Sequence, residues 1–326
     1  MTALVIGASG HIGAHLVRRL QVEGYRVRAL VRATSDLRGL AAVDAEIVHG
    51  DVLDPGSLAA AMRGCEEVYH LAAPTARQGD TGRIITEGTR NVLRQCLKAG
   101  AKRLVYTSSI VTVGYSSDPG MVLDEQASQR TDAGAYHTAK WLAEKELLQS
   151  AEGVDLAVVV VNPATVIGPL DYRVTPSTAP IHRCLMRGLR WGFPGGVTVV
   201  HAGDVARGHV LAMQHGRRGQ RYILGGERLT VRDYFALIAA ACGRPGPLLT
   251  LPRAAILACA AVFSVAERLS GRPMPFSFTQ ARHLVGRYGW YSSEKAMREL
   301  GYRWRPAAEA VADYVRWARA GRPSSG

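Results

Sequence analysis

Short apolar runs alternate with amphipathic stretches through the first half of the chain. Runs of this kind, rich in valine and leucine, have the length and composition of buried strands. The predicted strands are Leu4–Gly7, Val27–Val31, Glu46–His49, Val68–Leu71, Leu104–Thr107 and Val158–Val161, and the predicted helices include Ile12–Glu23, Thr89–Ala99 and Ala139–Gln149. Strands at this spacing, each followed by a helix, predict a doubly wound parallel α/β sheet that is covered on both faces.

The regular alternation ends after Asn162 and Pro163. A loop-rich segment, 168–196, contains several prolines and glycines, and the elements predicted after it are Arg221–Leu224 (strand), Val231–Cys242 and Ala307–Ala320 (helices). We expect residues 1–165 to form the sheet domain. Residues 166–326 are expected to form mainly a smaller substrate-binding lobe, with some segments returning to the sheet domain.

The most apolar stretch of the chain is Ala254–Ala266. It is shorter than the roughly 18 to 20 residues that a membrane-spanning helix needs, so we expect no integral membrane segment. A buried helix is the first interpretation, and a helix that touches lipid or substrate is the alternative. Weak association with a membrane surface therefore stays open.

The composition is that of a packed globular protein, with 47% hydrophobic and 21% charged residues. Five scattered cysteines without a C-x-x-C spacing argue against disulfides and a metal site, and fit a reducing cytoplasm. The residues after Met1 carry no signal-peptide pattern. The net charge of +13 is spread over arginines along the chain without a nucleic-acid motif, so we expect no nucleic-acid partner.

Glycines recur at the junction between the first predicted strand and the first predicted helix, in the sequence GASGHIG. They allow a tight turn and a close approach to a pyrophosphate, and the helix N-terminus attracts the phosphates. This position makes the pattern much stronger than a lone glycine motif. It predicts a Rossmann-type dinucleotide site with Gly7, Ser9, Gly10, His11, Ile12 and Gly13 as cofactor-binding residues.

The end of the second strand distinguishes the two nicotinamide cofactors. NAD enzymes place a carboxylate there, whereas an arginine accommodates the 2′-phosphate of NADP. This chain has Arg32 and no carboxylate until Asp36, so we predict NADP(H) as the cofactor. Further predicted cofactor-binding residues follow the third, fourth and fifth strands: Asp51, which could accept a hydrogen bond from the adenine, Val52, Leu71, Ala72, Ala73 and Thr107.

The candidate catalytic residues are Ser109, Tyr136 and Lys140. Tyr136 and Lys140 are four residues apart at the start of a predicted helix, which places them on one face. A nearby ammonium favours phenolate, so we expect Lys140 to lower the pKa of Tyr136 into the range of proton transfer. Ser109 follows the fifth strand, where its hydroxyl could hold a carbonyl oxygen; Ser108 is the less favoured choice.

Taken together, these motifs resemble those of the extended short-chain dehydrogenases/reductases, the NAD-dependent epimerase/dehydratase family. The likeness extends almost to the C-terminus and is greatest to the dihydroflavonol-reductase-like and hopanoid-associated epimerase-like branches. The matching segments are GASGHIG (7–13), HGDV (49–52), YHLAA (69–73), VYTSSIVTVG (105–114), YHTAK (136–140), NPATVIGP (162–169), RYILGGERLT (221–230) and YSSEKAMRELGYRWRP (291–306).

The resemblance implies that Tyr136 is the general acid/base, and that Lys140 tunes Tyr136 and holds the nicotinamide ribose. It also implies a homodimer formed through helices of the main domain. The segment that passes beside the nicotinamide would be Pro163, Ala164, Thr165 and Val166. One departure is Ile85, which stands where the family often has asparagine.

Three functions compete for this set of residues. The first is an NADPH-dependent ketoreductase that reduces a ketone or aldehyde of a largely apolar small molecule. The second is a nucleotide-sugar epimerase or dehydratase, and the third is a non-catalytic NADP-binding regulator. Ile110 and Val111 stand where sugar dehydratases carry acidic residues, and Arg32 favours NADP(H), so the sequence favours the reductase. His182, His201 and Tyr172 could line the substrate pocket, and an aromatic loop with Trp191 and Phe193 suits a substrate of little charge.

Overall fold

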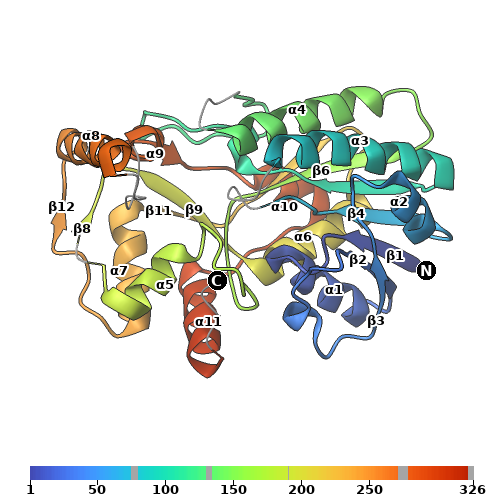
Figure 1. The fold of residues 1–326 in the computed structure, drawn as a ribbon, viewed down its shortest axis with the longest axis horizontal. Coiled ribbons are helices and arrows are strands. Elements are labelled where there is room, and N and C mark those ends of the chain that lie inside the picture. Colours follow the sequence, from blue (N-terminus) through green and yellow to red (C-terminus); the bar gives the residue numbers. More distant parts are fainter. Residues whose placement is uncertain (75–79, 130–133, 190, 271–277, 322–326) are drawn as a thin grey trace.

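Seven parallel strands form the central sheet, in the order β10-β6-β5-β4-β1-β2-β3 (Figure 1). The computed structural model describes residues 1–74, 80–129, 134–189, 191–270 and 278–321. The predicted doubly wound α/β fold is therefore confirmed. The strands are β1 (Thr2–Ile6), β2 (Arg26–Val31), β3 (Ala45–His49), β4 (Glu67–His70), β5 (Arg103–Thr107), β6 (Ala157–Pro163) and β10 (Arg221–Leu224).

Alternating residues of the inner strands of this sheet enter two separate cores. In β1, Ala3 and Val5 belong to one core, and Leu4 and Ile6 to the other. Helices α1 (His11–Val22) and α6 (Ala202–His215) cover the first face, and α2 (Pro55–Met62), α3 (Thr81–Ala99) and α4 (Ala135–Ser150) cover the second. Because both faces of the inner strands are buried, both faces carry mainly apolar side chains.

The predicted strands and helices of the first half are present, with shifted ends. The largest shift is in α3, which begins at Thr81 instead of Thr89. Asp80 caps this helix, since its carboxylate accepts a hydrogen bond from the backbone N–H of Arg83. The added turns contain Gly82 and Gly88, residues of low helix propensity.

The loop-rich segment and its neighbours form more regular structure than the sequence indicated. A second sheet combines β7 (Thr165–Ile167), β9 (Gly196–His201), β11 (Glu227–Thr230) and β13 (Tyr288–Gly289), and α6 was not predicted. Helices α5 (Ala179–Arg187), α7 (Val231–Cys242) and α11 (Ala307–Ala320) pack with β9 in a third core. The remaining elements are η1 (Arg38–Leu40), η2 (Ile110–Thr112), β8 (Trp191–Gly192), β12 (Leu249–Thr250), α8 (Arg253–Ser270), α9 (Phe278–Leu284) and α10 (Glu294–Leu300).

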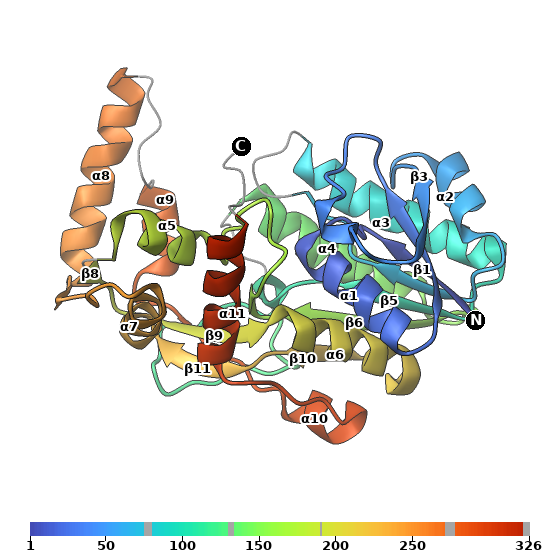
Figure 2. The ribbon, with the colours of Figure 1, turned by 90° about the horizontal axis from the view of Figure 1, so that it is seen from below.

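The chain returns to the central sheet after the second sheet has begun. Strand β10 pairs in parallel with β6, with Arg221 opposite Val160 and Ile223 opposite Asn162. Figure 2 shows α6 and α10 beside β10, at the boundary between the central sheet and the lobe. Residues distant in sequence are thereby brought to the edge of the site.

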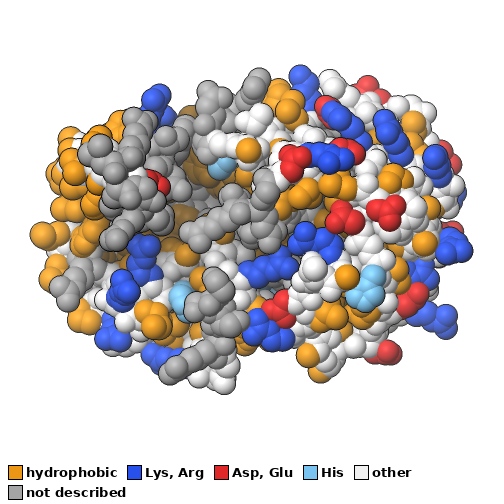
Figure 3. Space-filling model, in the orientation of Figure 1, with side chains coloured by type: hydrophobic (Ala, Val, Ile, Leu, Met, Phe, Trp, Pro, Cys, Tyr) orange, Lys and Arg blue, Asp and Glu red, His pale blue; other side chains and the backbone are white. Residues whose placement is uncertain are grey.

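The apolar helix α8 packs against α9 through one side only. Ile256 and Ala260 are buried with residues of α9, but Val262 and Val265 are 66% and 53% exposed. The interpretation of 254–266 as a fully buried helix is therefore wrong. Figure 3 shows apolar side chains gathered at this end of the molecule. In the described part of the chain, no helix combines the length and apolar character needed to cross a bilayer.

Candidate active site

A cavity of about 830 Å³ lies at the carboxyl ends of the central strands, between the sheet and the lobe. This is where open α/β sheets bind their ligands. Leu170, Tyr172, Pro176 and Leu284 are among the residues that line it from the lobe side. The predicted site residues that line it are Gly7, Ser9, Gly10, His11, Ile12, Gly13, Leu71, Ala73, Thr107, Ser109, Tyr136, Lys140, Pro163, Ala164, Thr165 and Val166.

The glycine loop leaves no room for side chains. Gly7 has φ +89°, and a Cβ there would lie 2.7 Å from the backbone nitrogen of Ala72. A Cβ at Gly13 would collide with the Gly7 carbonyl oxygen. Helix α1 begins at His11 without a side-chain cap, so the N–H groups of its first turn remain for an anion. This cradle fits the pyrophosphate of a dinucleotide.

The predicted 2′-phosphate ligand lies outside the residues that line the cavity. Arg32 directly follows β2 and is exposed, and within the described structure its guanidinium makes no hydrogen bond or ion pair. Asp36 does line the cavity, and its carboxylate is held by Arg38 at 2.6 Å. The negative charge of Asp36 is thus already compensated by the guanidinium of Arg38.

Three other predicted cofactor residues also lie outside the cavity lining, for different reasons. The backbone of Ala72 lies directly against Gly7, so it leaves no room for a side chain at position 7. Val52 is buried, with its carbonyl bonded to the Asn91 side chain at 3.0 Å. One Asp51 carboxylate oxygen accepts the backbone N–H of Leu53 at 2.9 Å, which leaves the second oxygen for a ligand.

Tyr136 and Ser109 meet across the cavity from different elements. Tyr136 is in the first turn of α4, and Ser109 caps η2 after β5, where its hydroxyl accepts the N–H of Val111 at 3.3 Å. The Ser109 side chain is also near enough to the Tyr136 hydroxyl to lower its pKa. Ser108 lines the same cavity, but its hydroxyl has no partner among the described residues.

The predicted lowering of the Tyr136 pKa by Lys140 is wrong for this structure. Burial raises the pKa of Tyr136, and the nearby Ser109 side chain offsets only part of this rise. The reason is the position of Lys140, whose Nζ lies 2.7 Å from the Thr107 carbonyl oxygen and 3.5 Å from the Tyr106 hydroxyl. Burial also lowers the pKa of Lys140 to about 7, which weakens its ammonium form.

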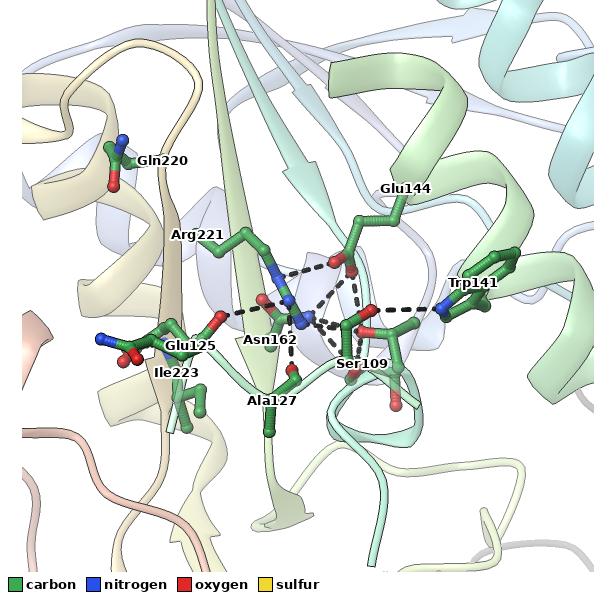
Figure 4. A network of polar contacts seen from close by, with 12 residues as sticks. Ser109, Glu125, Ala127, Trp141, Glu144, Asn162, Gln220, Arg221 and Ile223 are labelled. Atoms are coloured by element: carbon green, nitrogen blue, oxygen red, sulfur yellow. Dashed lines mark hydrogen bonds and ion pairs between the residues drawn. The ribbon is translucent and has the colours of Figure 1, made fainter. Parts of the chain in front are cut away.

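A buried polar network behind Ser109 was not predicted from the sequence (Figure 4). Glu144 of α4 contacts Arg221 of β10 at 2.7 Å, Asn162 of β6 at 2.9 Å and Thr112 of η2 at 2.8 Å. Glu144 follows Lys140 by one helical turn, and this spacing is the only signal of it in the sequence.

Of the residues suggested for the substrate pocket, Tyr172 lines the cavity and the others do not. His201 instead contacts Asp313 at 3.2 Å and Arg305 at 2.8 Å, outside the cavity. His182, Trp191, Phe193 and helix α8 are also absent from the lining. Ile85 is buried in the core, where it has no polar role. Within the described residues, no group of three His, Cys, Asp or Glu side chains could hold a metal.

Comparison with known proteins agrees with this arrangement. Residues 3–225 match the NAD dependent epimerase/dehydratase family, so the chain belongs to this family, the extended short-chain dehydrogenases/reductases. It is 37% identical to the "Putative dihydroflavonol 4-reductase" of Synechocystis sp., covering 96% of this chain and 93% of that one. It is 33% identical to Sterol demethylase protein B of Methylococcus capsulatus, covering 98% of both.

Among solved structures, the chain is similar to that of gox2253. The TM-score is 0.87 and the sequences are 33% identical, with 99% of each chain covered. Because the match spans both the central sheet and the lobe, the likeness concerns the whole arrangement around the cavity and not the sheet alone.

Proposed function

We propose that this protein is an NADP(H)-dependent reductase of ketones or aldehydes on largely apolar small molecules. The observation that carries the proposal is that Ser109, Tyr136 and Lys140 line one cavity together with the glycine loop. A proton donor, a second hydroxyl and a cradle for pyrophosphate in one cavity fit carbonyl reduction.

A reduced nicotinamide bound in this cavity supplies the hydride that goes to the carbonyl carbon. Tyr136 gives its hydroxyl proton to the carbonyl oxygen, so the product is an alcohol and the tyrosine later recovers a proton from water. Ser109 donates a hydrogen bond to the same oxygen and holds it beside Tyr136. Lys140, whose Nζ lies beside the Thr107 carbonyl oxygen, would hold the nicotinamide ribose.

The choice of NADP(H) rests on the charges beyond β2. Arg32 is exposed and uncommitted within the described structure, and Asp36 is paired with Arg38. A 2′-phosphate would therefore meet guanidinium groups, whose planar fork suits phosphate oxygens. The family as a whole uses nicotinamide dinucleotides, as its name states.

The substrate class rests on the lobe side of the cavity. Val166, Leu170, Pro176 and Leu284 line it from the lobe, and Ile110 and Val111 line it from the sheet domain. The lobe lining also includes one acid and one base, Asp171 and Arg173, so it carries no net positive charge for a substrate diphosphate. The names of the two relatives, a dihydroflavonol reductase and a sterol demethylase component, also refer to polycyclic compounds of low charge. The helix 254–266 and the Trp191 loop, which first suggested such a substrate, do not contribute to this lining.

The second candidate function is nucleotide-sugar epimerisation or dehydration, which the family name includes. Ile110 and Val111 weaken this candidate, because their side chains line the cavity where a dehydratase needs acidic groups. A non-catalytic regulator is weaker still, since Ser109, Tyr136 and Lys140 all line the cavity.

A substrate screen tests the proposal. NADPH consumption is measured by absorbance with apolar cyclic ketones and aromatic aldehydes. In parallel, conversion of UDP- and GDP-sugars, which consumes no net NADPH, is followed by chromatography of the sugar products. Turnover of at least one apolar carbonyl above every nucleotide sugar is expected. Conversion of a nucleotide sugar, with every apolar carbonyl inert, would replace the reductase by the epimerase.

The expected homodimer and cytoplasmic location remain proposals. Helices α3 and α4 pack side by side on one face of the sheet, so they are the candidates for contact with a second copy (Figure 1). Their outer surfaces carry ion pairs such as Arg90–Glu146. Sedimentation of the whole protein distinguishes a dimer from a monomer directly.

A further inference from the structure

Glu144 lies one helical turn beyond Lys140 on α4. Tyr136, Lys140 and Glu144 are spaced by four residues, which places them along one face of the helix. Lys140 is 2% exposed and Glu144 is 4% exposed. Two opposite charges are therefore buried close together next to the cavity, and buried charges of this kind need each other and good hydrogen bonds.

Three elements other than α4 fix the Glu144 carboxylate. One oxygen lies 2.7 Å from Nε of Arg221 on β10. The other lies 2.8 Å from the Thr112 hydroxyl and 2.9 Å from the Asn162 amide nitrogen on β6. Figure 4 shows the Arg221 and Asn162 side chains converging on the carboxylate. With partners on both oxygens, the carboxylate has a single well-defined position.

The same polar groups hold the main chain of Ser109. Its carbonyl oxygen lies 3.1 Å from the Asn162 amide nitrogen and 2.9 Å from the Thr112 hydroxyl. Arg221 also reaches the Thr112 hydroxyl, at 3.3 Å. The carboxylate thus connects α4, which carries Tyr136, to the segment that carries the nearby Ser109.

The electrostatic surroundings of Lys140 give Glu144 a second effect. Burial lowers the pKa of Lys140. Within the described residues, the negative charge of Glu144 partly offsets this decrease, because it favours the protonated ammonium. Apart from the Thr107 carbonyl, the polar groups that face Lys140 are the Tyr106 hydroxyl of β5 and the buried His70 of β4. Neither side chain supplies a negative charge at neutral pH.

We propose that Glu144 is a positioning residue for this site. Its carboxylate balances the buried Lys140 ammonium and, through Asn162 and Thr112, fixes Ser109 beside Tyr136. The role of the site as a reductase rests on the function proposed above, but the balance of charge between Glu144 and Lys140 is a property of the protein alone.

Lysine NMR tests this charge balance without cofactor or substrate. The chain contains five lysines, so ¹³Cε-lysine labelling of the whole protein gives few signals, and Lys140→Met identifies that of Lys140. In Glu144→Gln, the titration midpoint of Lys140 is expected to fall by one pH unit or more, because the opposing negative charge is gone. Glu146→Gln is the matched control: it removes an exposed charge two residues away, and the midpoint should stay in place.

A second variant keeps the test decisive if Glu144→Gln does not fold. In Arg221→Gln, the carboxylate loses its cationic partner and acts more strongly on Lys140, so the Lys140 midpoint is expected to rise. A Lys140 midpoint that is the same in folded Glu144→Gln as in the unmodified protein overturns the inference. If only Arg221→Gln folds, a Lys140 titration midpoint that stays the same or falls in this variant overturns the inference.

A double-mutant cycle tests the link to Ser109. Glu144→Gln and Ser109→Ala are each expected to lower kcat. The fold-loss in the double variant is expected to be smaller than the product of the two single fold-losses, because both substitutions act through the Ser109 hydroxyl. Fully multiplicative losses contradict this link. If the unmodified protein oxidises no NADPH with any carbonyl, the proposed function fails while the NMR result stays readable, so the two failures are distinguishable.

Discussion

The Lys140 ammonium nitrogen lies 2.7 Å from the Thr107 carbonyl oxygen, at the end of β5. This contact anchors the side chain at the carboxyl end of β5, the strand that leads to Ser109, and both Lys140 and Ser109 line the cavity. Lys140 is therefore placed to act on whatever binds above it, and less on Tyr136 itself.

Replacing Lys140 by methionine should damage both turnover and cofactor affinity. Methionine keeps the apolar part of the side chain but removes the ammonium group that we assign to the nicotinamide ribose. We expect kcat to fall and the Kd for NADPH to rise together, measured by single-turnover kinetics and fluorescence titration. Lys145→Met, an exposed position on the same helix, is the control. Unchanged NADPH affinity in Lys140→Met would refute the ribose assignment.

Replacing Tyr136 by phenylalanine should affect turnover alone. The ring keeps its packing, but the general acid is lost, so kcat should fall by about 10² to 10⁴-fold. NADPH binding should change little, because the ring is retained. Tyr115 also lines the cavity, and Tyr115→Phe shows whether another phenol does this work. Near-normal turnover of Tyr136→Phe would mean that the proton comes from elsewhere.

The two neighbouring serines should differ in their effect. Ser109 lies near the Tyr136 hydroxyl and lowers its pKa, whereas the Ser108 hydroxyl has no partner in the described structure. Ser109→Ala should lower kcat more modestly than Tyr136→Phe does, because Tyr136 can still hold the carbonyl oxygen. Ser108→Ala should have a much smaller effect than Ser109→Ala. The kcat values of the two variants, measured under the same conditions, test this difference. A larger loss of kcat in Ser108→Ala than in Ser109→Ala would assign the contact with the carbonyl oxygen to Ser108.

Replacing Arg32 by aspartate should weaken NADPH selectively. The change removes a charge-assisted contact and adds repulsion, so it should cost on the order of 2 to 4 kcal/mol in NADPH binding. Arg26→Asp makes the same change of charge at the opposite end of β2 and should leave NADPH binding unaffected. Titrations with NADPH and NADH measure both. Equal affinity of the unmodified protein for the two cofactors would disprove the predicted NADP(H) preference.

The protein should lose stability below pH 6.5. Burial lowers the pKa of His15 and His70 to about 3 and that of His209 to about 4. The unfolded chain takes up protons on these groups near pH 6.5 while the folded chain does not, so stability falls as the pH drops through this window. Each histidine contributes a loss of about 1.4 kcal/mol per pH unit.

Urea unfolding at several pH values measures this loss. His209→Gln should flatten the dependence on pH, whereas His49→Gln, at an exposed position, should leave it unchanged. A free energy of unfolding that stays constant between pH 7 and pH 5 would show that these imidazoles are not held neutral.

The sequence was most informative where local chemistry decides the structure. The glycine loop could be predicted because Gly7 needs a positive φ and lies against backbone, which only glycine permits. The start of α3 could not, because Gly88 lowers helix propensity. In the fold, Gly88 serves close packing, since a Cβ there would lie 2.7 Å from a Val52 methyl carbon. Packing of this kind is invisible to propensity.

Contacts between distant segments were the other part that the sequence could not provide. Glu144 and Arg221 are brought together by the pairing of β10 with β6. No local sequence pattern indicates that these two strands pair. The same holds for the cavity lining, where Trp191 and Phe193 looked suitable by composition yet lie elsewhere. Local motifs predicted the candidate reacting groups, whereas the surroundings that tune them depend on topology.

The late position of β10 in the chain imposes an order on biosynthesis. While the ribosome has delivered residues only as far as β6, one edge of that strand has no neighbour, and Glu144 has no arginine to meet. An open strand edge is a template for pairing with other chains. The nascent protein must therefore keep this edge from wrong partners until residues 221–224 emerge, and the Ser109 segment reaches its final form only then.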